Sequence, residues 1–518
     1  MRAAVLAWQP GRLRLARVLF VLTVAYAGAV FWLAHYPPMI DLPQHAGQIA
    51  ALRELLLGTS PWGDVLRINL YTPYLIGYGL GLLLSFFMPV TAALKLLLSA
   101  SCYAFVAMCI ALRARFGADE RLDWLFIPSF FGLAYKWGFL TFLVAAPVGL
   151  AFIWVARSYQ ERPQMRNGMV LTLFGVALFF CHGLLFLAAA AIGAAFLIAD
   201  GFFRRRGWRH VAVALLPYFA LAAVFLVYFA IDRVEERAMA AHPAPLLWGY
   251  DLHRLFGLAV FIFGNSGDWR LAPFALIMLA VPWLLGCRLN AAASCAWVPL
   301  AVVLAMWAVV PQFALGTAWM YERFGMFLLP FYALLFRRGE RVAPARRRDR
   351  RPAPAVVQGL AALVCWALLA LESDRIAAFD RETRDFDAVM EAAAPGQRAL
   401  SLMFDPASRA ARDSREYGHF PLWYQADKGG LVDMNFAWYP PQVVRFRPDR
   451  LPAVELGFEW NPRSFDWTRH HGRTYRYFFV RGGPLPPAVI RNGECPVALL
   501  KSSGPWSLYE RGACDPAK

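Results

Sequence analysis

The sequence lacks the short motifs that mark many soluble enzymes. It contains no Gly-rich phosphate loop, no HExxH and no GxSxG, so the usual signatures of nucleotide hydrolases, zinc metalloproteases and α/β-hydrolases are missing. It also shows no internal repeat of the kind on which many transporters are built. Lysine is scarce, with five residues at positions 95, 136, 428, 501 and 518. This bias is typical of a bacterium with a GC-rich genome.

Apolar residues are abundant. Hydrophobic residues make up 59% of the 518 residues, and one run extends from Val176 to Ala199 with His182 as its only strongly polar member. This content exceeds that of soluble domains. The net charge of +17 comes from short basic runs between apolar spans, where the positive-inside rule expects them. The sequence therefore predicts a polytopic α-helical membrane protein, with no nucleic-acid partner.

The arginines indicate the topology. Four arginines between residues 2 and 17 precede an apolar span at 18–34 that is too long for a signal-peptide core and has no small-x-small cleavage site. We therefore expect an uncleaved anchor with a cytoplasmic N-terminus. If residues 71–89 lie flat in the interface, 23 basic residues fall in the inner segments and 8 in the outer loops before residue 372. This asymmetry favours about eleven transmembrane helices.

Residues 1–371 then form the transmembrane domain, and residues 372–518 form an extracytoplasmic domain. The expected spans are 18–34, 91–112, 122–135, 139–156, 169–181, 183–199, 211–231, 271–287, 291–310, 324–336 and 355–371. In the tail, a helical pattern at 374–393 is followed by strand-like alternation at 399–404, 475–480, 497–501 and 506–510, which predicts a small α/β domain.

Two of the eight cysteines differ from the rest. Cys495 and Cys514 lie in the polar tail, whereas the other six lie in apolar segments without ligand-like spacing and are expected to be core residues. If the tail is extracytoplasmic, Cys495 and Cys514 can form a disulfide worth roughly 3 kcal/mol.

The first outer loop, within residues 35–90, carries the leading candidate for chemistry. Asp41 lies among Pro37, Pro38 and Pro43, and it precedes a helical pattern at 43–57 with Ile49, Leu52 and Leu56 on one side. A membrane-surface helix is the simplest interpretation. Partial desolvation at the interface would raise the pKa of the carboxyl and make it a competent general base. The alternative is that Asp41 only caps the helix.

Five further side chains are candidates for the same site, each with a plain structural alternative. His45 either orients Asp41 or an acceptor, or has no chemical role. Lys95 either meets a lipid phosphate or extends to the head-group layer. Arg323 suits a phosphate and Glu322 a sugar hydroxyl, unless the two form a local ion pair in an aromatic belt. His182, at a predicted hairpin tip, is either a turn residue or part of a site wall.

The sequence offers no metal motif. Several acids and histidines lie in the segment 232–270, namely Glu235, Glu236, His242, Asp251 and His253. Their spacing matches no zinc pattern, so a solvated loop is the preferred interpretation. No cofactor is expected, and a divalent ion remains an alternative without a motif to support it.

With these residues in place, the layout resembles the GT-C superfamily of membrane glycosyltransferases. In that group an acidic residue follows the first span, and two interfacial helices come after it. Asp41 matches the acidic position, residues 43–57 the first helix and residues 71–89 the second. Lys95 falls where aminoarabinose and mannosyl transferases of the group often carry an arginine. The chain departs from some members because it lacks a clear second acid after the third span and a WWDYG-like signature.

The resemblance implies an inverting transfer of a sugar from a polyprenyl-phosphate donor to the hydroxyl of a glycan, lipid or protein. Asp41 would be the base, and Lys95 and Arg323 would stabilise the leaving phosphate. It also implies a multi-pass protein of the bacterial inner membrane whose C-terminal domain is periplasmic. The rival interpretations are a transporter and a non-catalytic assembly protein.

Overall fold

The structure is a computed structural model. It describes residues 12–203, 207–239, 246–250, 252–264, 269–291, 293, 295–314, 316–339 and 353–515. Six described helices are long and apolar enough to cross a membrane. They are α1 (Arg12–Ala29), α4 (Val90–Arg115), α7 (Leu140–Glu161), α9 (Gly183–Phe203), α11 (Leu216–Met239) and α16 (Pro354–Ala392).

Four described apolar helices are shorter, namely α3 (Leu75–Ser85), α8 (Met165–Cys181), α13 (Ala272–Leu284) and α14 (Val298–Val309). The remaining described α-helices are α2 (Leu42–Leu57), α5 (Phe126–Ser129), α6 (Leu133–Trp137), α10 (Trp208–Ala214), α12 (Leu252–Val260), α15 (Leu328–Ala333), α17 (Leu422–Lys428) and α18 (Pro487–Ile490). The chain is thus a mostly helical protein with several apolar helices, as expected of a polytopic membrane protein. The count of eleven spans stays a prediction.

Two expected spans, 122–135 and 324–336, consist of short helical segments. Residues 122–135 form a 3₁₀ helix at Glu120–Leu125 and then the short helices α5 and α6. Gly132 lies at the break, where another part of the backbone comes close: a Cβ there would lie 2.6 Å from the carbonyl oxygen of Ile262. Residues 324–336 likewise form a 3₁₀ helix at Glu322–Phe327 followed by α15. Close backbone packing, which only glycine permits, therefore replaces a regular span in the first case.

The first helix of the first outer loop is buried rather than lying on a surface. Every residue of α2 from Leu42 to Leu52 is buried, on all sides of the helix, whereas an interfacial helix would keep a polar face in contact with water. Of the three residues expected to share its apolar side, Ile49 and Leu52 are buried and Leu56 is exposed. The expectation of a membrane-surface helix is therefore wrong for the first three turns of α2, because α3, α4 and the tail cover them.

The tail contains a five-stranded sheet in the order β10-β11-β9-β6-β7. Its strands are β6 (Arg398–Met403), β7 (Leu431–Val432), β9 (Tyr477–Arg481), β10 (Val497–Ser503) and β11 (Trp506–Arg511). β6 runs parallel to β7 and β9, and the other pairs are antiparallel. All four expected strands are present, and Cys495 and Cys514 form a disulfide.

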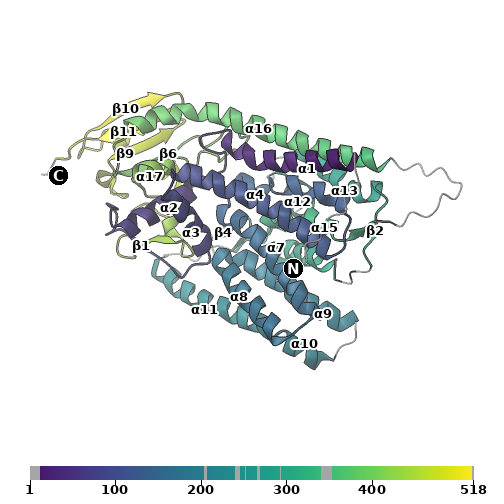
Figure 1. The fold of residues 1–518 in the computed structure, drawn as a ribbon. Coiled ribbons are helices and arrows are strands. Elements are labelled where there is room, and N and C mark those ends of the chain that lie inside the picture. The colour runs from purple at the N-terminus through teal and green to yellow at the C-terminus, as the bar shows by residue number, and fades with distance from the viewer. Residues whose placement is uncertain are drawn as a thin grey trace.

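A single helix joins the membrane part to this sheet. α16 is continuous across the expected boundary between residues 371 and 372, and Figure 1 shows it running along one edge of the molecule toward the strands β9–β11. Its second half packs on the sheet, where the Phe386 ring lies 4.9 Å from the Trp506 ring. α16 therefore carries the tail back to the end of the bundle that holds the first outer loop.

The tail and the first outer loop form one folded unit. The strand β1 (Leu66–Ile68) pairs antiparallel with β8 (Val444–Phe446). One buried side chain reinforces this pairing: the Gln48 amide donates to the carbonyl of Val444 at 3.1 Å and accepts from its N–H at 2.9 Å.

Two further short ladders pair β2 (Arg288–Leu289) with β5 (Phe336–Arg337), and β3 (Phe313–Ala314) with β4 (Thr317–Ala318).

Replacing Gln48 should loosen this unit. Gln48→Met keeps the length of the side chain but leaves both polar groups of Val444 without these partners, which should cost roughly 2–4 kcal/mol. Hydrogen exchange at residues 440–447, followed by mass spectrometry, should become faster. Gln397→Met is the matched control, because the Gln397 amide bonds only at the surface, to the Pro395 carbonyl at 3.3 Å. Equal protection in both variants would contradict the assignment.

Candidate functional site

Asp41 occupies the N-cap position of α2 but does not act as a cap. Its side chain makes no capping hydrogen bond, and its exposed fraction is 7%. The backbone N–H of Asp41 donates instead to the carbonyl of Trp137 at 2.8 Å. The alternative in which the carboxylate serves only the helix end is therefore wrong. The carboxylate is held in place by its backbone and left available to other partners.

Gly138 makes this position possible. Its φ angle is +92°, a conformation that side chains other than glycine adopt at a cost. A Cβ at residue 138 would also lie 2.9 Å from the backbone nitrogen of Asp41 and 3.0 Å from that of Leu42. The turn after α6 can thus approach the start of α2 closely enough to hold Asp41 only because residue 138 is glycine.

The tail supplies a histidine next to the carboxylate. His419 Nε2 lies 3.5 Å from Asp41 Oδ1, and His419 Nδ1 lies 3.0 Å from Gln44 Nε2. Gln44 uses its carbonyl oxygen to accept from the N–H of Phe436 at 2.8 Å, so its amide N–H₂ must donate to Nδ1. The neutral imidazole therefore carries its proton on Nε2, directed at Asp41. Burial lowers the pKa of His419 to about 4, so this ring is neutral at pH 7.

Burial raises the pKa of Asp41 to about 8. The charge of Arg323 and a hydrogen bond from the Trp137 side chain act in the opposite direction, and Glu459 of the tail raises the pKa further. The pKa of Glu459 is itself raised to about 7 by burial. A carboxyl that titrates near neutral pH is suited to accept a proton in a reaction, whereas one in water is a weak base.

Arg323 is a buried cation fixed by backbone carbonyls. Its Nε donates to the carbonyl of Trp319 at 2.9 Å and its Nη2 to that of Ala318 at 2.6 Å, and its guanidinium lies 3.9 Å from the centre of the Phe139 ring. Trp319 has a φ angle of +55°, in the turn that supplies these carbonyls. Burial lowers the pKa of Arg323 to about 10, so the side chain stays charged at pH 7.

The two predicted histidines line the same region. His182, 2% exposed, packs against the rings of Tyr74 and Phe142 at 5.1 and 5.2 Å, and Arg323 and His45 act on it electrostatically. His45 Nδ1 lies 2.8 Å from the hydroxyl of Tyr78, and burial lowers the pKa of His45 to about 3. Both histidines are therefore buried: His45 lies against the Tyr78 hydroxyl, and His182 lies in the turn between α8 and α9, where the charge of Arg323 acts on it.

The other two predicted residues differ from this group. Glu322 is 1% exposed, and burial raises its pKa to about 7. Both of its carboxylate oxygens are buried and make no hydrogen bond of standard geometry to the described residues, and the charge of Arg323 offsets the burial only weakly. Lys95 lies over the Trp32 ring at 5.8 Å and interacts electrostatically with Asp380 of α16. No interaction described for Lys95 joins it to Asp41.

Three residues of the site were not expected, namely Trp137, His419 and Glu459. His419 and Glu459 come from the tail, and Gln44 and His419 are 375 positions apart in the sequence, so no local pattern relates them. Arg415 adds a further link, because its guanidinium lies 5.6 Å from the Trp137 ring and 5.8 Å from the Trp460 ring. In the sequence, Trp137 was marked only by its place with Lys136 and Gly138 in the short turn between the expected spans 122–135 and 139–156.

No metal site is found in the part of the chain that the structure describes, since no three His, Cys, Asp or Glu side chains converge there. The five side chains considered between residues 232 and 270, Glu235, Glu236, His242, Asp251 and His253, lie outside what the structure describes.

Removing the charge of Asp41 should stabilise the protein in a pH-dependent way. The folded-state pKa of about 8 lies above the ordinary value of 3.8, so stability is highest when the carboxyl is protonated and falls as the pH rises from about 4 to 8. Asp41→Asn should therefore melt at a higher temperature than the wild type, with a gap that widens up to about pH 8 and then levels. Thermal unfolding in detergent between pH 5 and 9 measures it.

Asp449→Asn is the control for this measurement, because the side chain of Asp449 is 77% exposed and its charge is solvated in the folded protein. A constant gap between Asp41→Asn and the wild type over the whole pH range would refute the burial effect at Asp41.

Similar proteins were found only among solved structures. No protein-family model matches the sequence, and no curated protein does. ArnT from Cupriavidus metallidurans, solved bound to undecaprenyl phosphate, aligns with a TM-score of 0.55 and 9% identity over 96% of this chain and 98% of its own. The mycobacterial arabinofuranosyltransferase AftD aligns with a TM-score of 0.47 and 13% identity over 98% of this chain. The chain spans 40% of the length of AftD. The chain therefore shares the overall fold of ArnT.

Proposed function

We propose that this chain, which has the fold of the GT-C glycosyltransferases, is a membrane enzyme that transfers a sugar from a polyprenyl-phosphate donor to an acceptor hydroxyl. The observation that carries the proposal is Asp41, a buried carboxylate with a pKa raised to about 8 that is not used as a helix cap and is opposed by the fixed cation Arg323. The fold supports the donor class, because ArnT of the same fold was solved with undecaprenyl phosphate.

In the proposed reaction, the acceptor hydroxyl gives its proton to Asp41 while its oxygen bonds to the anomeric carbon. The bond from that carbon to the phosphate oxygen breaks, and the lipid phosphate leaves with the electron pair. Attack opposite the leaving group inverts the anomeric configuration. Arg323 stabilises the charge on the phosphate. His419 holds the Asp41 carboxylate from the side of the tail, and His45 and His182 form the wall beside Arg323.

The same proposal includes the orientation of the chain in the membrane. The basic inner segments support a cytoplasmic N-terminus in a bacterial inner membrane, and the disulfide between Cys495 and Cys514 fits an oxidising compartment such as the periplasm. Glycan, lipid and protein hydroxyls are all acceptors of suitable chemistry. The convergence of polar side chains at one end of the bundle favours an enzyme over a transporter, whose polar residues gather at the bilayer midplane.

The first test is the activity of Asp41→Asn with polyprenyl-phosphate sugars. Loss of a general base should lower kcat by about 10²–10⁴-fold, and the wild-type rate should rise with pH up to about 8, where the carboxyl becomes deprotonated. Single-turnover assays on purified protein, with thermal unfolding to verify the fold, measure both. Undiminished turnover by Asp41→Asn would remove this residue from the mechanism.

The second test separates the two cations expected from the sequence. Arg323→Gln should weaken binding of undecaprenyl phosphate about 10-fold or more, because a charge-assisted hydrogen bond is worth about 1.5–3 kcal/mol. Lys95→Gln should change it less, since Lys95 contacts Trp32 and is influenced by Asp380 instead. Native mass spectrometry of the detergent-purified chain can compare the two. A larger loss for Lys95→Gln would place the phosphate elsewhere.

A further inference from the structure

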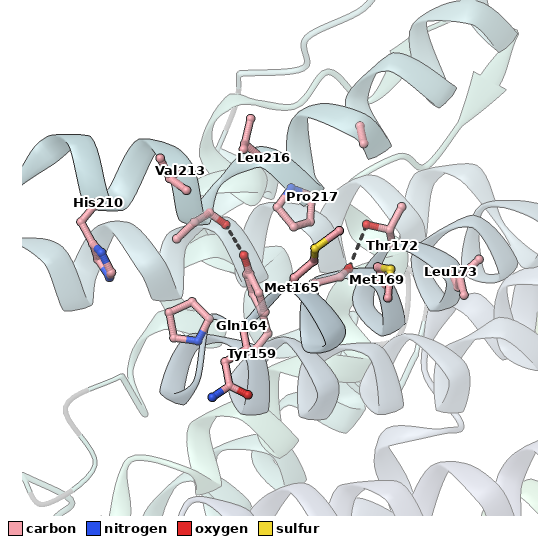
Figure 2. A pocket seen from close by; sticks show the side chains of 14 residues that line it. Tyr159, Gln164, Met165, Met169, Thr172, Leu173, His210, Val213, Leu216 and Pro217 are labelled. Atoms are coloured by element: carbon pink, nitrogen blue, oxygen red, sulfur yellow. Dashed lines mark hydrogen bonds between the residues drawn. The ribbon is translucent and has the colours of Figure 1, made fainter.

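A groove of about 590 Å³ opens between α7, α8, α10 and α11, and Figure 2 shows it from close by. It lies at the end of the helices away from Asp41. α7 starts at Leu140, close after Gly138, and reaches the groove only at Tyr159; α8 leaves the groove and ends just before His182. Because α7 has 22 residues, the two ends are about 30 Å apart. The groove is therefore separate from the candidate site.

The walls of the groove are apolar and open outward. Met165, Leu173 and Val213, which line it, are 84%, 72% and 65% exposed, in segments that belong to the membrane part of the chain. Two polar groups of the floor are already used: the Tyr159 hydroxyl donates to the carbonyl of Ala214 at 2.9 Å, and Thr172 donates to that of Gly168 at 3.0 Å (Figure 2). Gln164 and His210 are the other polar side chains of the lining, and both are exposed. The groove therefore suits a hydrocarbon chain, and its volume is in the range of ligand pockets.

Three exposed arginines flank the groove in the sequence. Arg162, Arg166 and Arg209 directly neighbour lining residues, and all three are exposed. The acid closest in sequence, Glu161, is engaged by Arg115 and Arg157. A net positive rim beside an apolar groove matches an amphiphile with an anionic head and a hydrocarbon tail.

We propose that this groove binds one anionic phospholipid of the surrounding leaflet. Its acyl chains occupy the space between α8 and α11, and its phosphate lies against Arg166 and Arg209. Gly168 allows the helices to pack closely at the floor of the groove, since a Cβ there would lie 3.3 Å from Pro217 and 3.4 Å from Tyr159. The lipid thus fills the gap left where the chain turns from α10 into α11. This site is independent of the proposed transfer reaction.

Native mass spectrometry of the full chain, purified in detergent and mixed with phosphatidylglycerol or phosphatidylcholine of the same acyl composition, tests the proposal. Wild-type protein should retain one phosphatidylglycerol in preference to phosphatidylcholine. Ala220→Trp fills the groove and should abolish this binding. Ala222→Trp is the matched control, because Ala222 is exposed on the same helix but does not line the groove.

The charge contribution has its own variant. Arg166→Gln with Arg209→Gln should weaken phosphatidylglycerol binding about 25-fold, at about 5-fold for each arginine, and remove the preference over phosphatidylcholine. Arg288→Gln, an exposed arginine of β2 outside the groove, should leave both unchanged. Equal binding of the two lipids by the wild type, or equal effects of Ala220→Trp and Ala222→Trp, would overturn the proposal. Because the arginines are exposed, this double variant remains informative if Ala220→Trp misfolds.

Discussion

The site depends on the balance between a buried carboxylate and a fixed cation. Removing a carboxylate from water is costly, and its pKa rises unless a positive charge or hydrogen bonds compensate. At Asp41 the compensation is partial: Arg323 and Trp137 act against burial, yet the pKa still rises to about 8. A closer ion pair would have kept the carboxyl permanently charged. The arrangement holds Asp41 near the point at which it gains or loses a proton in neutral solution.

This balance requires that water be excluded from both Asp41 and Arg323. Arg323 and His182 come from the transmembrane domain and His45 from the first outer loop, whereas the tail supplies His419 and Glu459 next to Asp41. The tail is held there by the pairing of β1 with β8 and by Gln48. Burial of Asp41 is therefore a joint product of two regions that are far apart in the sequence.

A second clamp holds the loop that leads to Asp41. Arg375 of α16 donates from Nη2 to the carbonyl of Pro38 at 3.1 Å and to the carboxylate of Glu372 at 2.7 Å. Both arginine and glutamate are buried, so the pair is costly to break. Since Pro37 and Pro38 already restrict the backbone, this contact sets the path of the chain into Asp41. The continuous α16 thus links the position of the tail to that of the candidate base.

Local patterns in the sequence were sufficient for some of these features. The isolated Asp41 after the first span and Arg323 beside aromatic residues were visible because charges are rare at such positions, and the tail strands were visible from their alternation. The amphipathic pattern of α2 was misleading, because burial on all sides by α3, α4 and the tail together is a tertiary effect. His419 and Glu459 were not predictable, since each is an ordinary residue of a polar segment until the fold brings it to Asp41.

In the proposed reaction, Arg323 stabilises two anions in succession. Before transfer, Arg323 stabilises the ionised Asp41, which must be deprotonated to act as a base. When the acceptor proton moves to Asp41, that negative charge disappears as charge develops on the departing phosphate. His45 and His419 have pKa values lowered to about 3 and about 4, so they stay neutral and do not compete. The Arg323 guanidinium can therefore stabilise first the Asp41 carboxylate and then the departing phosphate without changing its position. This keeps the electrostatic cost low throughout the step.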